Sequence, residues 1–128
     1  MASFRELKVW QLGTELAIDV YGATRSFPND ERFGLISQMR RAAVSIPSNI
    51  AEGHGRNSTP EMIRFCGYAL GSVAELETQI TISQGLGFGN SNELTSVLEK
   101  CDTTSRMLHG LIRSNRGRDN HNSGSANE

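Results

Sequence analysis

Histidine and cysteine are the side chains best suited to metal binding or nucleophilic catalysis, and this sequence contains few of them. Its three histidines, His54, His109 and His121, fall in three different regions of the chain. The two cysteines, Cys66 and Cys101, lie on apolar stripes, where cysteine acts as a small hydrophobic residue. No HExxH motif, CxxC motif or helix-spaced Glu/His pair is present. The pattern therefore predicts no metal site and no cofactor.

Two further patterns could support chemistry. The segment Gly53-His54-Gly55-Arg56 resembles a phosphate cradle, but a phosphate-binding loop has a longer glycine frame followed by Lys-Ser/Thr. A helix C-cap and turn explains the same residues more simply. Ser45 and Ser48 lie near no histidine in the sequence, and no Gly-x-Ser-x-Gly turn occurs. We expect the protein not to be an enzyme.

Composition excludes several classes of protein. The 128 residues include 13 Lys and Arg against 14 Asp and Glu, for a net charge of −1. That balance excludes a nucleic-acid-binding protein that is basic over its whole surface, and it excludes an acidic disordered chain. Apolar stretches are too short to span a membrane, and the N-terminus lacks the apolar region of a signal peptide. Two cysteines are too few for a disulfide framework. We expect a soluble cytoplasmic protein with free thiols.

Apolar residues recur with helical spacing in four segments, around residues 7–21, 36–50, 62–80 and 94–111. The near-heptad step and the short connections predict an all-α fold, an antiparallel up-down-up-down four-helix bundle. The predicted core contains one or more residues of each segment: Trp10, Leu16, Ile36, Met39, Ile46, Leu76, Val97 and Leu108.

Helix boundaries follow from capping residues and prolines. Pro28–Glu31, Ser58–Glu61 and Asn90–Glu93 each predict the start of a helix, the second, third and fourth respectively. Pro47 predicts a kink in the second helix; the alternative is that this helix ends near Val44. Residues 1–113 form the predicted bundle. Residues 114–128 form a predicted disordered polar tail, because the segment starting at Ser114 has almost no apolar residue.

A polar stripe on the second helix has two interpretations. Arg41, Ser45, Ser48 and Glu52 lie beside its apolar stripe. Small hydroxyl residues are poor helix formers, so their clustering suggests the close approach of another helix or subunit. An ordinary solvated face explains the stripe equally well. Together with the wide apolar cover of the first helix, the stripe predicts an oligomer interface, since a bundle interior uses one face of each helix.

The stretch from Phe33 to Gly53, FGLISQMRRAAVSIPSNIAEG, resembles the signature of a bacterial family. These are four-helix-bundle proteins encoded in intervening sequences of 23S ribosomal RNA genes. The segments Phe4–Trp10, Ser58–Glu61 and Gly71–Glu77 and the residue Arg56 continue the resemblance, which covers roughly Phe4 to Arg113. It implies an antiparallel four-helix bundle that assembles into a ring-like homopentamer, and it assigns no catalytic residue. A related branch is the accessory protein of diversity-generating retroelements, which partners a reverse transcriptase and contacts nucleic acid.

The predicted topology collects positive charge at one end of the bundle. The starts of the first and third helices meet the ends of the second and fourth, so the basic residues of these four regions converge: Arg5, Lys8, Arg56, Arg64, Arg113 and Arg116, with Arg118 beyond them. We expect this end to bind RNA or DNA through phosphates without reading sequence. Base stacking is not expected, because only Phe4 and Phe65 lie near this end.

Two classes of function therefore remain. One is a non-catalytic, oligomeric bundle that binds nucleic acid. The other is a protein-interaction scaffold, for example an accessory partner of a reverse transcriptase.

Overall fold

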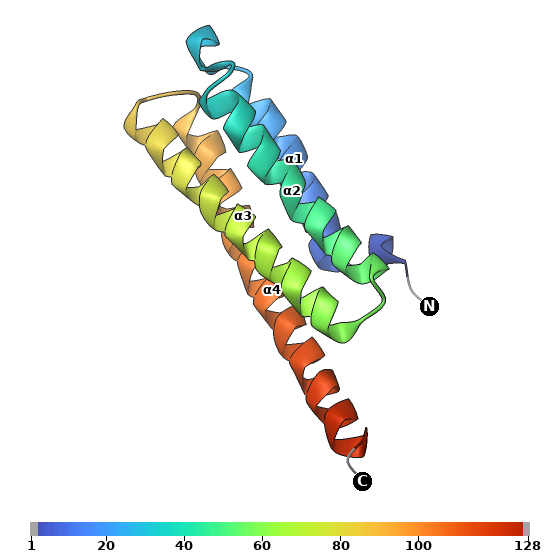
Figure 1. Ribbon diagram of the computed structural model, residues 1–128. Helices are drawn as coiled ribbons and strands as arrows, with labels where there is room; N and C mark the ends of the chain where they lie inside the picture. Colours follow the sequence, from blue (N-terminus) through green and yellow to red (C-terminus); the bar gives the residue numbers. More distant parts are fainter. Residues whose placement is uncertain (1–2, 127–128) are drawn as a thin grey trace.

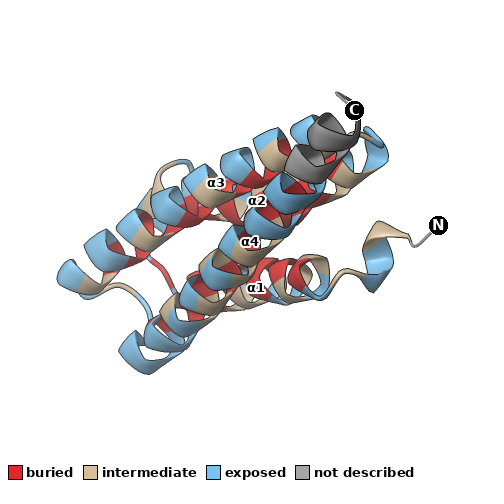
Figure 2. Ribbon diagram, turned by 90° about the horizontal axis from the view of Figure 1, so that it is seen from below, coloured by how far each residue is buried: buried red, intermediate tan, exposed pale blue. Residues whose placement is uncertain are grey.

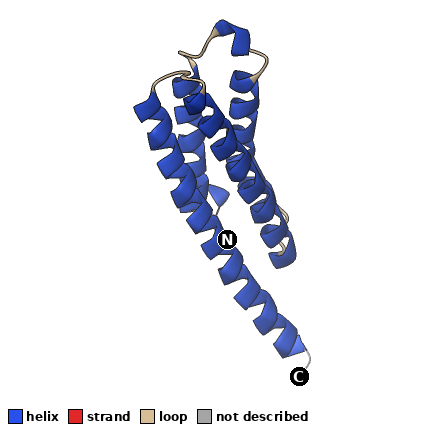
Figure 3. Ribbon diagram, turned by 90° about the vertical axis from the view of Figure 1, so that its left-hand side faces the viewer, coloured by secondary structure: helices blue, strands red, loops and turns tan. Residues whose placement is uncertain are grey.

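The computed structural model describes residues 3–126, with side chains for residues 3–118. Its four long helices run alternately up and down (Figure 1): α1 (Lys8–Thr24), α2 (Leu35–Gly55), α3 (Thr59–Gly85) and α4 (Ser91–Ala126). Two single-turn 3-10 helices, η1 (Phe4–Glu6) and η2 (Asn29–Glu31), precede α1 and α2. Helices and loops account for all of the described residues, without a strand (Figure 3). The predicted all-α, antiparallel four-helix bundle is confirmed.

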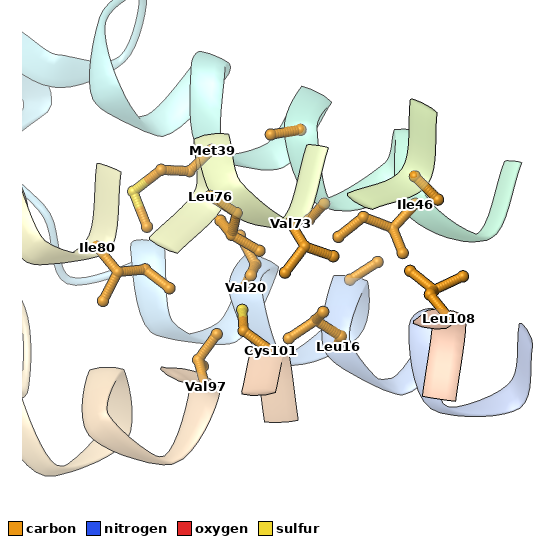
Figure 4. Close-up of a cluster of buried hydrophobic side chains, with 14 of the residues drawn as sticks. Leu16, Val20, Met39, Ile46, Val73, Leu76, Ile80, Val97, Cys101 and Leu108 are labelled. Atoms are coloured by element: carbon orange, nitrogen blue, oxygen red, sulfur yellow. The ribbon is translucent and has the colours of Figure 1, made fainter. Parts of the chain in front are cut away.

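The core lies between the four helices, with the buried side of each helix turned inward (Figure 2). Leu16 of α1, Met39 and Ile46 of α2, Leu76 of α3 and Leu108 of α4 are fully buried and point toward one another (Figure 4). These five and Val97 confirm most of the predicted core.

Trp10 and Ile36 correct that core prediction, because both are only partly buried. Each lies within three residues of the start of its helix, where fewer neighbouring helices cover a side chain. Trp10 makes an edge-on contact with the ring of Phe4 instead, with ring centroids 5.3 Å apart.

Helix α2 passes through Pro47 without interruption, so the alternative end near Val44 is wrong. The kink predicted near Pro47 is not shown. Pro47 is buried against α1, where a β-carbon on Gly13 would lie 3.4 Å from the β-carbon of Pro47. The absence of a side chain on Gly13 thus makes room for the proline ring at the α1–α2 contact.

Two of the three predicted caps are present. The hydroxyl of Ser58 accepts a hydrogen bond from the Glu61 backbone N–H, and Asn90 Oδ1 accepts one of 2.9 Å from the Glu93 N–H. The prediction for α2 is wrong: Asn29–Glu31 form η2, and α2 starts later, at Leu35. Phe27 is buried against Phe88, so the chain packs inward after α1, before η2 and α2 begin.

Helix α4 is longer than predicted. It continues past Arg113 to Ala126, whereas we expected disorder from Ser114; residues 127–128 of that segment lie outside the described residues. Asn115 continues the buried stripe of Leu108 and Ile112, and its Nδ2 donates a hydrogen bond of 2.8 Å to the Leu111 carbonyl. No proline interrupts the segment, and extension of an existing helix avoids the cost of nucleating a new one. The last turns project beyond the other helices, at the end that holds the N-terminus and the α2–α3 connection (Figures 1 and 3).

Candidate nucleic-acid and assembly surfaces

The six basic residues predicted to bind nucleic acid lie at one end of the bundle, which we call the basic end. They come from η1 and the adjacent start of α1, from the end of α2, from the first turns of α3 and from the later part of α4, segments that the topology brings together (Figure 1). All are exposed: Arg5, Lys8, Arg56, Arg64, Arg113 and Arg116. Arg118 is exposed there too and, with Asn115, lines a hollow of about 260 Å³ beside the α2–α3 connection.

Helix dipoles explain only part of this charge. Arg56 caps the C-terminus of α2, where positive charge is favoured. Arg113 and Arg116 lie more than two turns before the end of α4 at Ala126, beyond the last turn over which the dipole acts. Lys8 is the first residue of α1, and Arg64 lies in the second turn of α3. Positive charge is disfavoured near a helix start, so Lys8 and Arg64 have no dipole explanation.

Two of the six basic residues have acidic neighbours. Arg56 forms an ion pair of 3.1 Å with Glu52, and Arg64 one of 3.3 Å with Glu61. Arg64 Nε also donates a hydrogen bond of 2.8 Å to the Tyr68 hydroxyl, which raises the pKa of the Arg64 guanidinium above its ordinary value. Because these ion pairs are solvent-exposed, they contribute little to stability, and both arginines stay available to a stronger anionic partner.

The segment Gly53-His54-Gly55-Arg56 ends α2 and starts the turn to α3. The Arg56 backbone N–H donates to the carbonyls of Glu52, at 3.1 Å, and Gly53, at 3.3 Å. Asn57 follows with a positive φ of 56°, a conformation that asparagine tolerates at helix ends. The segment is therefore a helix C-cap and turn, as the simpler interpretation predicted.

An apolar groove lies between α1 and α2. We call it the α1–α2 groove; its volume is about 540 Å³. Ile18, which is 70% exposed, and Tyr21 and Val44, which are 42% exposed each, line it. A smaller hollow next to it shares Tyr21 and Val44 and includes Phe33, which is 88% exposed. Apolar side chains this exposed and this close together are typical of interaction surfaces.

The four residues of the predicted polar stripe do not share one surface. Ser48 lines the α1–α2 groove, and Arg41 lines the adjacent hollow beside Phe33. Ser45 points instead toward α3, where its hydroxyl oxygen lies 2.6 Å from that of Ser72. Glu52 is exposed and pairs with Arg56 at the basic end. The close approach of another helix that Ser45 suggested is therefore found inside the bundle, with α3.

Residues 5–110 match the family described as 23S rRNA-intervening sequence protein. The chain belongs to this family. A crystal structure of a protein with unknown function from the S23 ribosomal protein family of Bacteroides thetaiotaomicron superposes with a TM-score of 0.75. It is 20% identical and covers 82% of this chain and 95% of its own, so the likeness shows the fold. Among curated proteins, no sequence matches the chain.

The structure places the cysteines of this intervening-sequence protein away from solvent. Cys66 and Cys101 are free thiols with no exposed surface. Burial raises the pKa of Cys66 to about 11 and, with the charge of Glu77, that of Cys101 to about 12. Neither thiol is therefore a reactive nucleophile at neutral pH. Within the described residues, His, Cys, Asp and Glu side chains form no group of three or more that could hold a metal ion, and no helix is long and apolar enough to cross a membrane.

Sequence reasoning missed three exposed apolar residues and one aromatic residue. Ile18, Phe33 and Val44 are apolar but belong to none of the predicted core stripes. An apolar residue outside those stripes is the sequence signal for an exposed apolar surface. Tyr68 is 47% exposed and bonded to Arg64, so the third turn of α3 extends the basic end with an aromatic ring.

Proposed function

We propose that this intervening-sequence protein is a non-catalytic, self-assembling helix bundle that binds the phosphate backbone of RNA or DNA through its basic end. The observation that carries the proposal is the convergence of exposed arginine and lysine side chains from four segments at one end. Because the net charge of the chain is −1, attraction to phosphate must come from this uneven distribution of charge. Arginine suits the task, since its planar guanidinium pairs with phosphate oxygens through two hydrogen bonds.

Self-assembly is supported by the α1–α2 groove. Bundle packing leaves Ile18, Tyr21 and Val44 exposed around one hollow, and covering them with a second copy would remove apolar surface from water. The pentamer number comes from the family resemblance. A ring would repeat the basic end once per subunit around its axis and multiply the phosphate contacts available to one nucleic acid.

The second candidate is a protein-interaction scaffold, for example for a reverse transcriptase. The same groove favours it, because an amphipathic helix of a partner protein docks into apolar grooves of this kind. In that case the groove serves a different protein rather than a second copy.

Two measurements test the proposal. Titration of labelled structured RNA with the protein at several salt concentrations should give binding that weakens steeply with salt, because each phosphate contact releases a counterion. Light scattering on the protein alone should give a mass several times that of one chain. Absence of RNA binding at low salt would contradict the proposed binding of nucleic acid. A mass equal to one chain would contradict self-assembly and favour the protein-interaction scaffold.

A further inference from the structure

Four side chains at the α2–α3 edge of the basic end form a stack of arginine and aromatic groups. The guanidinium of Arg56 lies 5.2 Å from the centre of the Phe65 ring. The guanidinium of Arg64 lies 5.8 Å from the centre of that ring and 5.6 Å from the centre of the Tyr68 ring. The two rings meet edge to face, with centroids 5.3 Å apart and an angle of 85°. We call these four residues the Tyr68 cluster.

Tyr68 is the exposed ring of this cluster. Phe65 is buried under Gly53, whereas Tyr68 is 47% exposed. Its neighbours Gly67 and Gly71 lie on the same exposed part of α3, and a β-carbon on either would meet no described atom within 4 Å. Glycine inside a helix costs about 1 kcal/mol relative to alanine, and no contact within the subunit compensates for that cost at these two positions. The surface beside the Tyr68 ring is therefore open to a planar group.

The cluster is also held in position. Arg64 Nε bonds to the Tyr68 hydroxyl at 2.8 Å, and Phe65 supports the ring from the core side. This restricts the side-chain motion that ligand binding would otherwise have to restrict. The ion pairs of Arg56 and Arg64 with Glu52 and Glu61 are exposed and weak, so a phosphate can replace either carboxylate at small cost.

We infer that the Tyr68 cluster is a stacking site for a base of single-stranded RNA or DNA, with Arg56 and Arg64 binding the phosphates on either side of that base. The inference rests on the proposed binding of nucleic acid by the basic end and specifies its form. Aromatic rings combined with arginines in a positively charged surface are the arrangement by which single strands are bound without sequence preference. Base pairs in a duplex do not offer an exposed base face to Tyr68, so the site favours single strands.

This inference replaces an expectation from the sequence. We expected contact through phosphates alone, because Phe4 and Phe65 were the only aromatic residues near this end. Tyr68 lies nine residues into α3, about 14 Å along the helix from its start. Its bond to Arg64 joins it to the basic end.

The test compares a single-stranded RNA of about 15 nucleotides with a duplex of the same length, by fluorescence anisotropy at several salt concentrations. Tyr68→Ala should weaken single-strand binding about 5- to 100-fold and leave duplex binding within about twofold. The slope of affinity against salt should not change, since tyrosine neutralises no phosphate. A 2-aminopurine base in the single strand should change its fluorescence on binding the native protein and lose that change with Tyr68→Ala.

Matched variants separate stacking from folding. Tyr68→Leu keeps apolar contact with Phe65 and should behave as Tyr68→Ala does, whereas Tyr68→Phe keeps the ring and should bind within about twofold of the native protein. Ile82→Ala is the control, because Ile82 is similarly exposed, at 48%, on the same helix, but lies near the end of α3 that is opposite to the basic end.

The outcomes distinguish this inference from the proposed function. If the native protein binds both nucleic acids and Tyr68→Ala leaves single-strand binding within about twofold, the stacking site is wrong and the basic end still binds phosphates. If Tyr68→Ala lowers the mass in light scattering and leaves nucleic-acid binding intact, the cluster is a protein interface, and the inference is wrong. If the native protein binds neither nucleic acid at low salt, the proposed function and the stacking site both fail.

Discussion

Gly53 of α2 and Phe65 of α3 pack so closely that a β-carbon on Gly53 would lie 2.7 Å from the β-carbon of Phe65. Real β-carbons do not approach one another to this distance, so only glycine lets the two helices meet here. The contact lies directly before the turn to α3 and positions Phe65 beneath the guanidiniums of Arg56 and Arg64. It therefore links the packing of the bundle to the geometry of the basic end.

Replacement of Gly53 by alanine should destabilise the bundle. The added methyl group would force α2 and α3 apart, and overpacking of this kind costs about 1–3 kcal/mol in the free energy of unfolding. Gly71→Ala is the matched control, because it lies in α3 with open space around it and should gain up to about 1 kcal/mol from helix propensity. Chemical denaturation followed by circular dichroism measures both. Equal stability of the two variants would show that the Gly53 contact is not tight.

A core truncation should cost more than the same truncation at the surface. Leu76 is fully buried between the helices, so Leu76→Ala should lower the free energy of unfolding by about 2–5 kcal/mol. Leu86 is 57% exposed near the end of α3, and Leu86→Ala should change it by less than about 0.5 kcal/mol. Comparable losses in thermal and chemical denaturation would contradict the described core.

Stability should fall at alkaline pH through the buried cysteines. Their folded pKa values, about 11 for Cys66 and about 12 for Cys101, lie above the ordinary value of 9.0. Each thiol therefore holds its proton more tightly in the folded chain, and its contribution to stability is complete below about pH 9 and lost as the pH rises through the folded pKa.

Equilibrium denaturation between about pH 8 and pH 12 measures this loss. The double variant Cys66→Ala, Cys101→Ala is the control for the lysine, tyrosine and arginine side chains that titrate in the same range. Its stability should depend less steeply on pH than that of the native protein. The same pH dependence in both proteins would mean that the thiols are not desolvated as described.

A charge in the α1–α2 groove should disrupt self-assembly. Ile18 is 70% exposed on one wall of the groove, and Ile18→Lys would place an ammonium group on the surface that is to be covered. Ile82→Lys is the control, since Ile82 is 48% exposed on α3, away from the groove. In light scattering, Ile18→Lys should shift the mass toward one chain while Ile82→Lys keeps the native mass. The opposite pattern would place the interface on α3.

The sequence predicts the bundle and most of its core because helical periodicity identifies the inward face of each helix directly. Leu16, Met39 and Leu76 follow from that periodicity alone. Periodicity does not show how far the neighbouring helices extend beside the first turn of a helix. For that reason the prediction that Trp10 and Ile36 are core residues is wrong.

The candidate surfaces were only partly predictable. The convergence of Arg64 and Arg113 at one end follows from topology, which fixes where helix ends meet. Contacts between side chains on different helices do not follow from topology. The partner of Ser45, Ser72, lies 27 residues away in the sequence, so the sequence alone does not reveal that Ser45 contacts α3 rather than another subunit. The contact of Arg56 with Phe65 likewise depends on how α2 and α3 pack.

The most direct test of the central claim removes charge from the basic end without touching the Tyr68 cluster. Arg113→Ala, Arg116→Ala is compared with Lys100→Ala, Arg106→Ala, a control that removes the same charge from the part of α4 farther from the basic end and must keep the native mass in light scattering. The measurement is the affinity for structured RNA as a function of salt. We predict that the first variant binds more weakly at low salt and has a salt slope shallower by about 2, while the control keeps both native values. Equal affinity and slope for native protein and both variants would contradict the account.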